Sequence, residues 1–267
     1  MKPRLLVLSL GGTITMVPTD GEGIAPKLGA EELVASVPAL ADVATIEARS
    51  PLRLPSPSLT LGQLTNVARE INAAFAEGMD GAVVIQGTDT IEESAFLLDL
   101  LVAGDKPVVV TGAMRGADAP GADGPANLLA AARTAASPQA RGLGTLVVLN
   151  YDIHAARFVQ KAHTALPSAF VSPLTGPLGT VVEGEPRIYV RVARRPVLDP
   201  VDPAPVALVT VAMGDDGRLV GPLAAAGFAG VVIEGMGAGH VPADMVPALG
   251  DLAHELPVVL ASRALTG

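Results

Sequence analysis

The sequence predicts an α/β fold: a large N-terminal domain with a parallel-rich sheet covered by helices on both faces, and a smaller C-terminal α/β domain. Short apolar runs alternate with helical patterns along the chain, which is the order of a parallel sheet with crossover helices. The runs are apolar at nearly every position, which indicates strands buried on both faces.

Four apolar runs in the first two thirds of the chain each end in a turn with small or polar residues. They are RLLVLSL (4–10), GAVVIQ (81–86), PVVVTG (107–112) and TLVVLN (145–150). We expect helices near 30–37, 60–77, 91–103 and 126–136. Ligands bind beyond the carboxyl ends of strands in open α/β sheets, so the turns after the four runs should gather around a site.

A change of composition near residue 190 marks the end of the first domain. The stretch VRVARRPVLDPVDPAP contains four prolines, and a residue before proline favours extended backbone. We therefore expect a domain at 1–190, a linker at 191–205 and an α/β domain at 206–267. A domain as short as the last is marginal by itself, so we expect it to be truncated or to contact a partner subunit.

Composition and charge exclude several classes of protein. Apolar residues make up 49% of the chain, which excludes a disordered protein, and no apolar stretch approaches the roughly 20 residues of a membrane helix. The first run is too short for a signal sequence, so we expect a cytoplasmic protein without a membrane partner. A net charge of −9 argues against a nucleic-acid partner. Without cysteine or an HExxH motif, no metal site is expected.

The turn after the first run contains Gly11, Gly12 and Thr13. Two glycines allow close approach of another backbone, although a plain tight turn would also use them. Neither the dinucleotide-binding nor the P-loop spacing follows. The polar segment at 15–33, rich in Gly and Pro, is typical of a functional loop or lid.

The turn after the second run places Thr88 and Asp89 directly before a helical pattern. The stretch from Thr90 to Glu93 matches a capping box, which explains those two residues but neither Thr88 nor Asp89. A threonine hydroxyl becomes a nucleophile when a neighbouring base takes its proton. The helix N-terminus favours a bound carboxylate or an oxyanion, so the turn could be part of a reaction centre.

Several motifs follow one another along the chain: GGTI at 11–14, LVASVPAL at 33–40, QGTDTIEESAFLLDL at 86–100, KPVVVTGAMR at 106–115, ADGPANL at 122–128, GPLG at 176–179 and ASR at 261–263. In this order and spacing they resemble the bacterial-type L-asparaginase/glutaminase family. The resemblance implies a cofactor-free hydrolase that converts the side-chain amide of L-asparagine, and in some members L-glutamine, to the acid and ammonia through a threonine acyl-enzyme. It also implies a homodimer or homotetramer.

The resemblance assigns roles to single residues. Thr13 corresponds to the nucleophile on the mobile loop. Thr88 and Asp89 correspond to the threonine and carboxylate that activate water and position the substrate. Ser56 would hold the substrate's α-carboxylate, and Asp89 its α-ammonium. The pocket would also be lined by the backbone of Gly12, Gly87 and Ala113.

The sequence departs from the family at three places. The resemblance places the family's lysine on the helix after ADGP, where an ungapped count reaches Pro138. The loop tyrosine of the family falls near Gly23, and the family motif HGTDT has become QGTDT at Gln86. Lys161, if its loop folds inward, and Lys27, on the mobile loop, are auxiliary candidates for the lysine.

A site without the family's lysine leaves two functions open. One is an active amidohydrolase with a different proton relay, since the loss of a general-base partner costs ~10²–10⁴ in rate. The other is a catalytically weak protein of the same fold that binds a small amino acid. His240, in MGAGHVP, would lie near the neighbouring subunit's pocket in an oligomer or be an ordinary turn residue.

Overall fold

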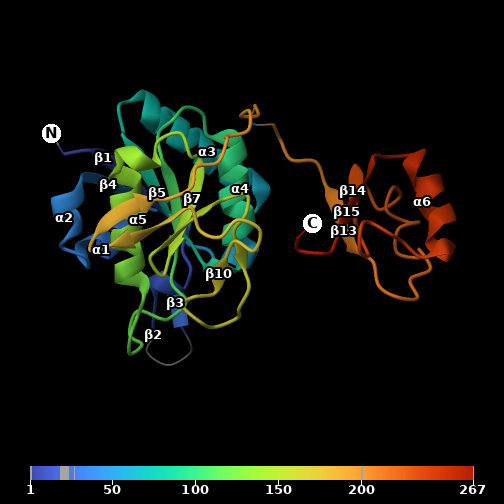
Figure 1. The fold of residues 1–267 in the computed structure, drawn as a ribbon, viewed down its shortest axis with the longest axis horizontal. Coiled ribbons are helices and arrows are strands. Elements are labelled where there is room, and N and C mark those ends of the chain that lie inside the picture. Colours follow the sequence, from blue (N-terminus) through green and yellow to red (C-terminus); the bar gives the residue numbers. More distant parts are fainter. Residues whose placement is uncertain (1, 19–23, 27, 200, 267) are drawn as a thin grey trace. The chain divides into compact units, whose positions relative to one another are not determined.

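The computed structural model describes residues 2–18, 24–26, 28–199 and 201–266. The chain forms two compact units, Met1–Val201 and Asp202–Gly267 (Figure 1). The division falls within the segment 191–205 that we expect to be a linker.

The larger unit is built on an eight-stranded sheet in the order β12-β11-β8-β7-β6-β5-β1-β4. Five neighbouring strands run parallel: β4 (Thr45–Arg49), β1 (Arg4–Ser9), β5 (Gly81–Ile85), β6 (Val108–Thr111) and β7 (Thr145–Leu149). Three antiparallel strands extend the sheet: β8 (Asp152–Ala155), β11 (Gly179–Val182) and β12 (Glu185–Ile188). The predicted α/β class is confirmed. The four apolar runs that we expect to be strands form β1, β5, β6 and β7.

Helices cover both faces of this sheet (Figure 1). One face packs against α3 (Leu61–Ala76) and α4 (Ile91–Leu101). The other face packs against α1 (Ala30–Ala35), α2 (Leu40–Val43) and α5 (Gly124–Ala136). Along β1, Leu6 and Leu8 belong to the first core while Leu5 and Val7 belong to the second. Alternate side chains of a strand point to opposite faces, so burial of both faces explains why the run is apolar throughout.

The order of the parallel strands places a crevice between β1 and β5. The chain leaves β1 towards β4 on one side and leaves β5 towards β6 on the other. The loops after two adjacent strands therefore diverge, which is the position where open α/β sheets bind ligands. Short 3-10 helices occupy the loops around this point: η1 (Thr13–Thr15), η2 (Ser56–Ser58) and η3 (Thr88–Thr90).

Two small hairpins accompany the sheet. β2 (Met16–Pro18) pairs with β3 (Ile24–Pro26) in the segment after β1. β9 (Gln160–Lys161) pairs with β10 (Phe170–Val171) between β8 and β11. A hydrogen bond of 2.9 Å between His154 Nδ1, on β8, and Ser172 Oγ, after β10, ties the second hairpin to the sheet.

The smaller unit has a three-stranded parallel sheet of β13 (Val206–Thr210), β14 (Gly230–Gly235) and β15 (Val258–Ser262). Its core joins this sheet to η5 (Ala243–Met245) and α6 (Val246–Ala253). In the described part of the chain, none of the helices has the length and hydropathy of a membrane-spanning segment.

The buried His154 makes stability depend on pH. Burial lowers the pKa of His154 to about 4, whereas in an unfolded chain it is about 6.5. Between these values the unfolded chain binds a proton that the folded chain does not, so stability falls by up to about 3 kcal/mol as pH falls from 6.5 to 4. In urea unfolding between pH 7 and 4, His154→Asn should lack this component.

The exposed His163 supplies the matched control, because His163→Asn in the same unit should keep the full pH dependence. An equal pH dependence for His154→Asn and the unmodified protein would contradict the assignment.

Candidate active site

The loops after β1 and β5 touch through two glycines. Gly12 has φ +94°, and a Cβ atom there would lie 2.1 Å from the backbone nitrogen of Gly87. A Cβ on Gly87 would in turn lie 2.7 Å from Ser56 Oγ. Only glycine permits both contacts, so three segments far apart in the sequence meet at the carboxyl edge of the sheet.

These segments surround a pocket of about 190 Å³. The pocket brings together six of the residues that the sequence singled out for the site: Gly12, Thr13, Ser56, Gly87, Thr88 and Asp89. Its remaining lining residues are Pro55, Pro57, Met114, Lys161 and Thr164. Ala113 does not line it but faces an adjacent apolar cavity of about 150 Å³. The next residue, Met114, reaches the pocket instead.

Lys161 supplies a cation to the centre of this site. Its Nζ donates hydrogen bonds to Thr88 Oγ1 at 2.9 Å and to Asp89 Oδ1 at 2.5 Å. The Lys161 side chain is only 15% exposed, so water competes little for these contacts. The Lys161 ammonium, the Thr88 hydroxyl and the Asp89 carboxylate thus form one hydrogen-bonded group at the N-terminal end of α4.

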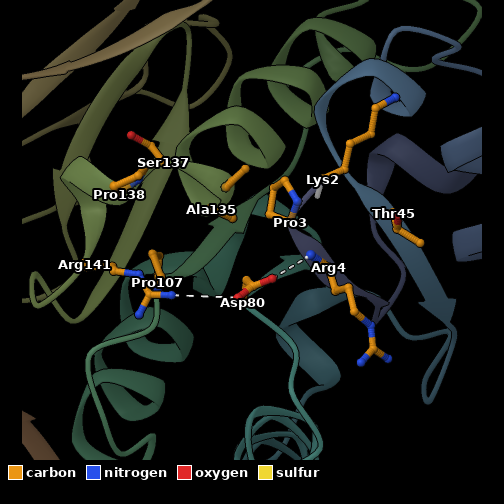
Figure 2. Close-up of a pocket in the computed structure, with 11 residues that line it drawn as sticks. Lys2, Pro3, Arg4, Thr45, Asp80, Pro107, Ala135, Ser137, Pro138 and Arg141 are labelled. Carbon is orange, nitrogen blue, oxygen red and sulfur yellow. Dashed lines mark hydrogen bonds and ion pairs between the residues drawn. The ribbon is translucent and has the colours of Figure 1, made fainter.

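Lys161, which the sequence offered as an auxiliary candidate for the family's lysine, thus lies in the pocket, whereas Pro138 does not line it. Figure 2 shows Pro138 beside a larger hollow of about 680 Å³, which Arg4 and Asp80 also line. Arg4 begins β1 and Asp80 precedes β5, so this hollow lies at the amino ends of the strands. A lysine at 138 would face the edge opposite Thr88, whereas Lys161 reaches Thr88 from the β9–β10 hairpin.

The loop that carries Thr13 is held on both sides of that residue. Thr15 is fully buried, and its Oγ1 donates to the carbonyl oxygen of Gly12 at 2.7 Å. Ile14 is buried against the start of α5, where a Cβ on Gly124 would lie 2.8 Å from Ile14 Cγ1. These contacts leave the partly exposed Thr13 side chain directed to the pocket that it lines.

The capping box predicted at Thr90 and Glu93 does not form. The Thr90 side chain makes no capping hydrogen bond to α4. Its hydroxyl donates to the carbonyl oxygen of Ser56 at 3.2 Å and accepts from Gln86 Nε2 at 3.3 Å. Gln86 is fully buried, so this chain of hydrogen bonds connects the end of β5 to the loop that carries Ser56.

Asp123 holds the loop after β6 against the pocket. Its carboxylate accepts from the backbone nitrogens of Met114 at 3.0 Å and Arg115 at 2.9 Å, and from Asn127 Nδ2 at 3.1 Å. Asn127 Nδ2 also donates to the carbonyl oxygen of Gly112 at 3.0 Å. The ADGPANL motif therefore positions Met114, a pocket residue that the sequence did not single out.

The structure does not test the other two auxiliary candidates, Lys27 and His240. Lys27 and the position of Gly23 fall outside the residues that the structure describes. His240 belongs to the smaller unit, where its backbone forms a tight bridge with Met236, with its nitrogen 2.8 Å from the Met236 carbonyl oxygen.

The arrangement is suited to nucleophilic attack by a hydroxyl. Thr13 and Thr88 line the same small pocket, and the lysine next to Thr88 can stabilise an alkoxide or relay a proton. The carboxylate of Asp89 is 62% exposed, so it can meet a cationic group of a ligand while one of its oxygens contacts Lys161.

Comparisons with known proteins agree along the whole chain. The model of the asparaginase N-terminal family matches residues 4–194, and that of the glutaminase/asparaginase C-terminal domain matches residues 205–267. A probable L-asparaginase of Deinococcus radiodurans is 38% identical over 99% of this chain and 81% of its own length. A glutaminase-asparaginase of Pseudomonas fluorescens biotype A is 35% identical over 93% of this chain and 72% of its own length.

A solved structure has the same fold. The crystal structure of a probable cytoplasmic L-asparaginase from Campylobacter jejuni superposes with a TM-score of 0.90 at 33% identity, covering 98% of this chain and 84% of that one.

The close contact between Gly12 and Gly87 predicts that one added methyl group at residue 12 strongly lowers the stability of the protein. Gly12→Ala should lower the free energy of unfolding by about 2 kcal/mol or more, because a Cβ atom would clash with Gly87 and the positive φ is strained for alanine. Gly62→Ala is the control, since a Cβ on this α3 residue meets nothing within 4 Å. That variant should be unchanged or up to ~1 kcal/mol more stable. Equal melting temperatures for the two variants would refute the close approach.

Proposed function

The chain belongs to the asparaginase/glutaminase family, and on this premise we propose that it hydrolyses the side-chain amide of L-asparagine to L-aspartate and ammonia. L-Glutamine is the second candidate substrate. The observation that carries the proposal is the contact of Lys161 with Thr88 and Asp89 in a pocket that Thr13 also lines.

In the first half of the reaction, the Thr13 hydroxyl attacks the amide carbon of the substrate. The C–N bond breaks, the hydroxyl proton is delivered to the leaving nitrogen, and ammonia departs from an acyl-enzyme on Thr13. Backbone N–H groups of the glycine-containing turns stabilise the negative charge that develops on the carbonyl oxygen.

In the second half, water attacks the ester on Thr13 and releases aspartate. The Lys161 Nζ contact with Thr88 Oγ1 stabilises the alkoxide form of Thr88, so that this oxygen can accept a proton from the attacking water. Thr88 and Lys161 thus act together in water activation.

The substrate is held by its amino-acid end. Asp89 Oδ1 accepts from Lys161, and we assign Oδ2 to the α-ammonium. Ser56 lines the same pocket and binds the α-carboxylate. A pocket of about 190 Å³ is smaller than the ~300–1,000 Å³ of pockets for drug-sized ligands, which supports a substrate as small as a single amino acid.

The alternative of a weakly active binding protein rested on a missing lysine. Lys161 contacts both Thr88 and Asp89, so the pocket contains a lysine and no observation now favours the alternative.

Ammonia release from L-asparagine tests the reaction. Thr13→Ala should lower kcat at least ~10³-fold because it removes the nucleophile, and Lys161→Met should lower kcat by ~10²–10⁴. Lys106→Met is the control, because Lys106 Nζ donates to the Phe75 carbonyl oxygen and precedes β6 at the opposite edge. A Thr13→Ala rate equal to that of the unmodified protein would end the proposal.

We also propose that the protein acts in the cytoplasm as a homodimer or homotetramer in which a neighbouring subunit completes the pocket. Support comes from the family resemblance and from the C. jejuni relative that is described as cytoplasmic. Size-exclusion chromatography with light scattering should return at least twice the chain mass of 26.9 kDa. A single species at 26.9 kDa would contradict the oligomer.

A further inference from the structure

The position of Lys161 depends on a very short hairpin. β9 consists of Gln160 and Lys161 only, and it pairs with the two residues of β10. A lysine side chain has four rotatable bonds and loses up to about 2 kcal/mol of rotamer entropy when it is held in one place. The backbone at Lys161 must therefore be fixed by contacts other than this pairing if Nζ is to stay on Thr88 and Asp89.

Glu92 makes such a contact. Its Oε2 accepts a hydrogen bond from the backbone nitrogen of Lys161 at 2.8 Å. Glu92 is the second residue of α4, which directly follows η3 with Thr88 and Asp89. The same rigid unit, η3 with the first turn of α4, thus binds Lys161 at both ends, at its amide and at its ammonium.

We propose that Glu92 is a positioning residue that fixes the backbone of Lys161 and thereby places Nζ on Thr88 and Asp89. The importance of that placement for catalysis rests on the proposed function. Glu92 touches neither the substrate nor the reacting atoms in this role, so it acts through Lys161.

The chemistry of a carboxylate suits this position. An ionised acceptor makes a stronger hydrogen bond to a backbone N–H than a neutral acceptor does. A negative charge in the first turn of a helix is also favourable. Glu93 shares this second property, since it stands in the same turn of α4, but it is exposed, and the hydrogen bond from β9 goes to Glu92 instead.

This neighbour gives a matched set of variants. Glu92→Ala removes the acceptor and should lower kcat by roughly 10- to 100-fold, since a displacement of about 1 Å can cost ~10² in rate. Glu92→Gln keeps an oxygen acceptor and should retain kcat within about threefold. Glu93→Ala removes the same charge from the same helical turn and should leave kcat near that of the unmodified protein. A loss in Glu93→Ala equal to that in Glu92→Ala would reduce the effect to helix electrostatics and overturn the proposal.

A double-mutant cycle tests whether Glu92 acts through Lys161. In a Lys161→Met background, Glu92→Ala should cause no further loss of kcat. A further loss as large as in the unmodified background would show that Glu92 acts elsewhere.

Hydrogen exchange tests the anchor without reference to catalysis. Amide exchange in the peptide 158–166 should be faster in Glu92→Ala than in Glu92→Gln, while peptides of β5 exchange alike in both variants. Equal exchange in 158–166 would refute the anchor whatever the activity. If the unmodified protein releases no ammonia from L-asparagine, the proposed function fails, and the exchange measurement still decides the role of Glu92.

Discussion

The close approach of the Gly12 and Gly87 backbones is the constraint on which the site depends. β1 and β5 are adjacent parallel strands, but the loops that follow them leave in opposite directions. The two loops can form one pocket only if they touch before they diverge, and a Cβ atom on Gly12 would leave 2.1 Å to the nitrogen of Gly87. Two glycines thus bring two threonines, from segments 75 residues apart in number, to one small volume.

The antiparallel part of the sheet adds the cation to this pocket. After β7 the chain reverses into β8 and then runs along the α4 side of the sheet, where Ala156, Val159 and Phe170 join the core that α3 and α4 form. The β9–β10 hairpin is the part of this excursion that reaches the carboxyl edge. Lys161 therefore reaches Thr88 from outside the parallel sheet. Its hydrogen bonds to Thr88, Asp89 and Glu92 hold it beside the start of α4.

Both faces of the central strands are buried, and this has a consequence for the polar groups within them. A buried polar group without a hydrogen-bond partner lowers the stability of the folded protein. Thr111 Oγ1 meets this need by donating to the Val148 carbonyl oxygen at 2.7 Å, and Asn127 does so at Gly112 and Asp123. The same hydrogen bonds that satisfy the core keep the loops of the site in place, so stability and site geometry share residues.

The sequence by itself determined the α/β class, the four buried strands and the family, because these depend on local hydrophobic patterns and on motifs in a fixed order. It also located Thr13, Thr88 and Asp89, since residues at the ends of parallel strands share one edge. Only the tertiary structure decided which lysine lies in the pocket, because Lys161 and Thr88 are 73 residues apart and no local pattern encodes their contact. It also decided the hydrogen-bond partner of Thr90. The Thr90 hydroxyl donates to the carbonyl oxygen of Ser56 and does not cap the helix that follows it in sequence.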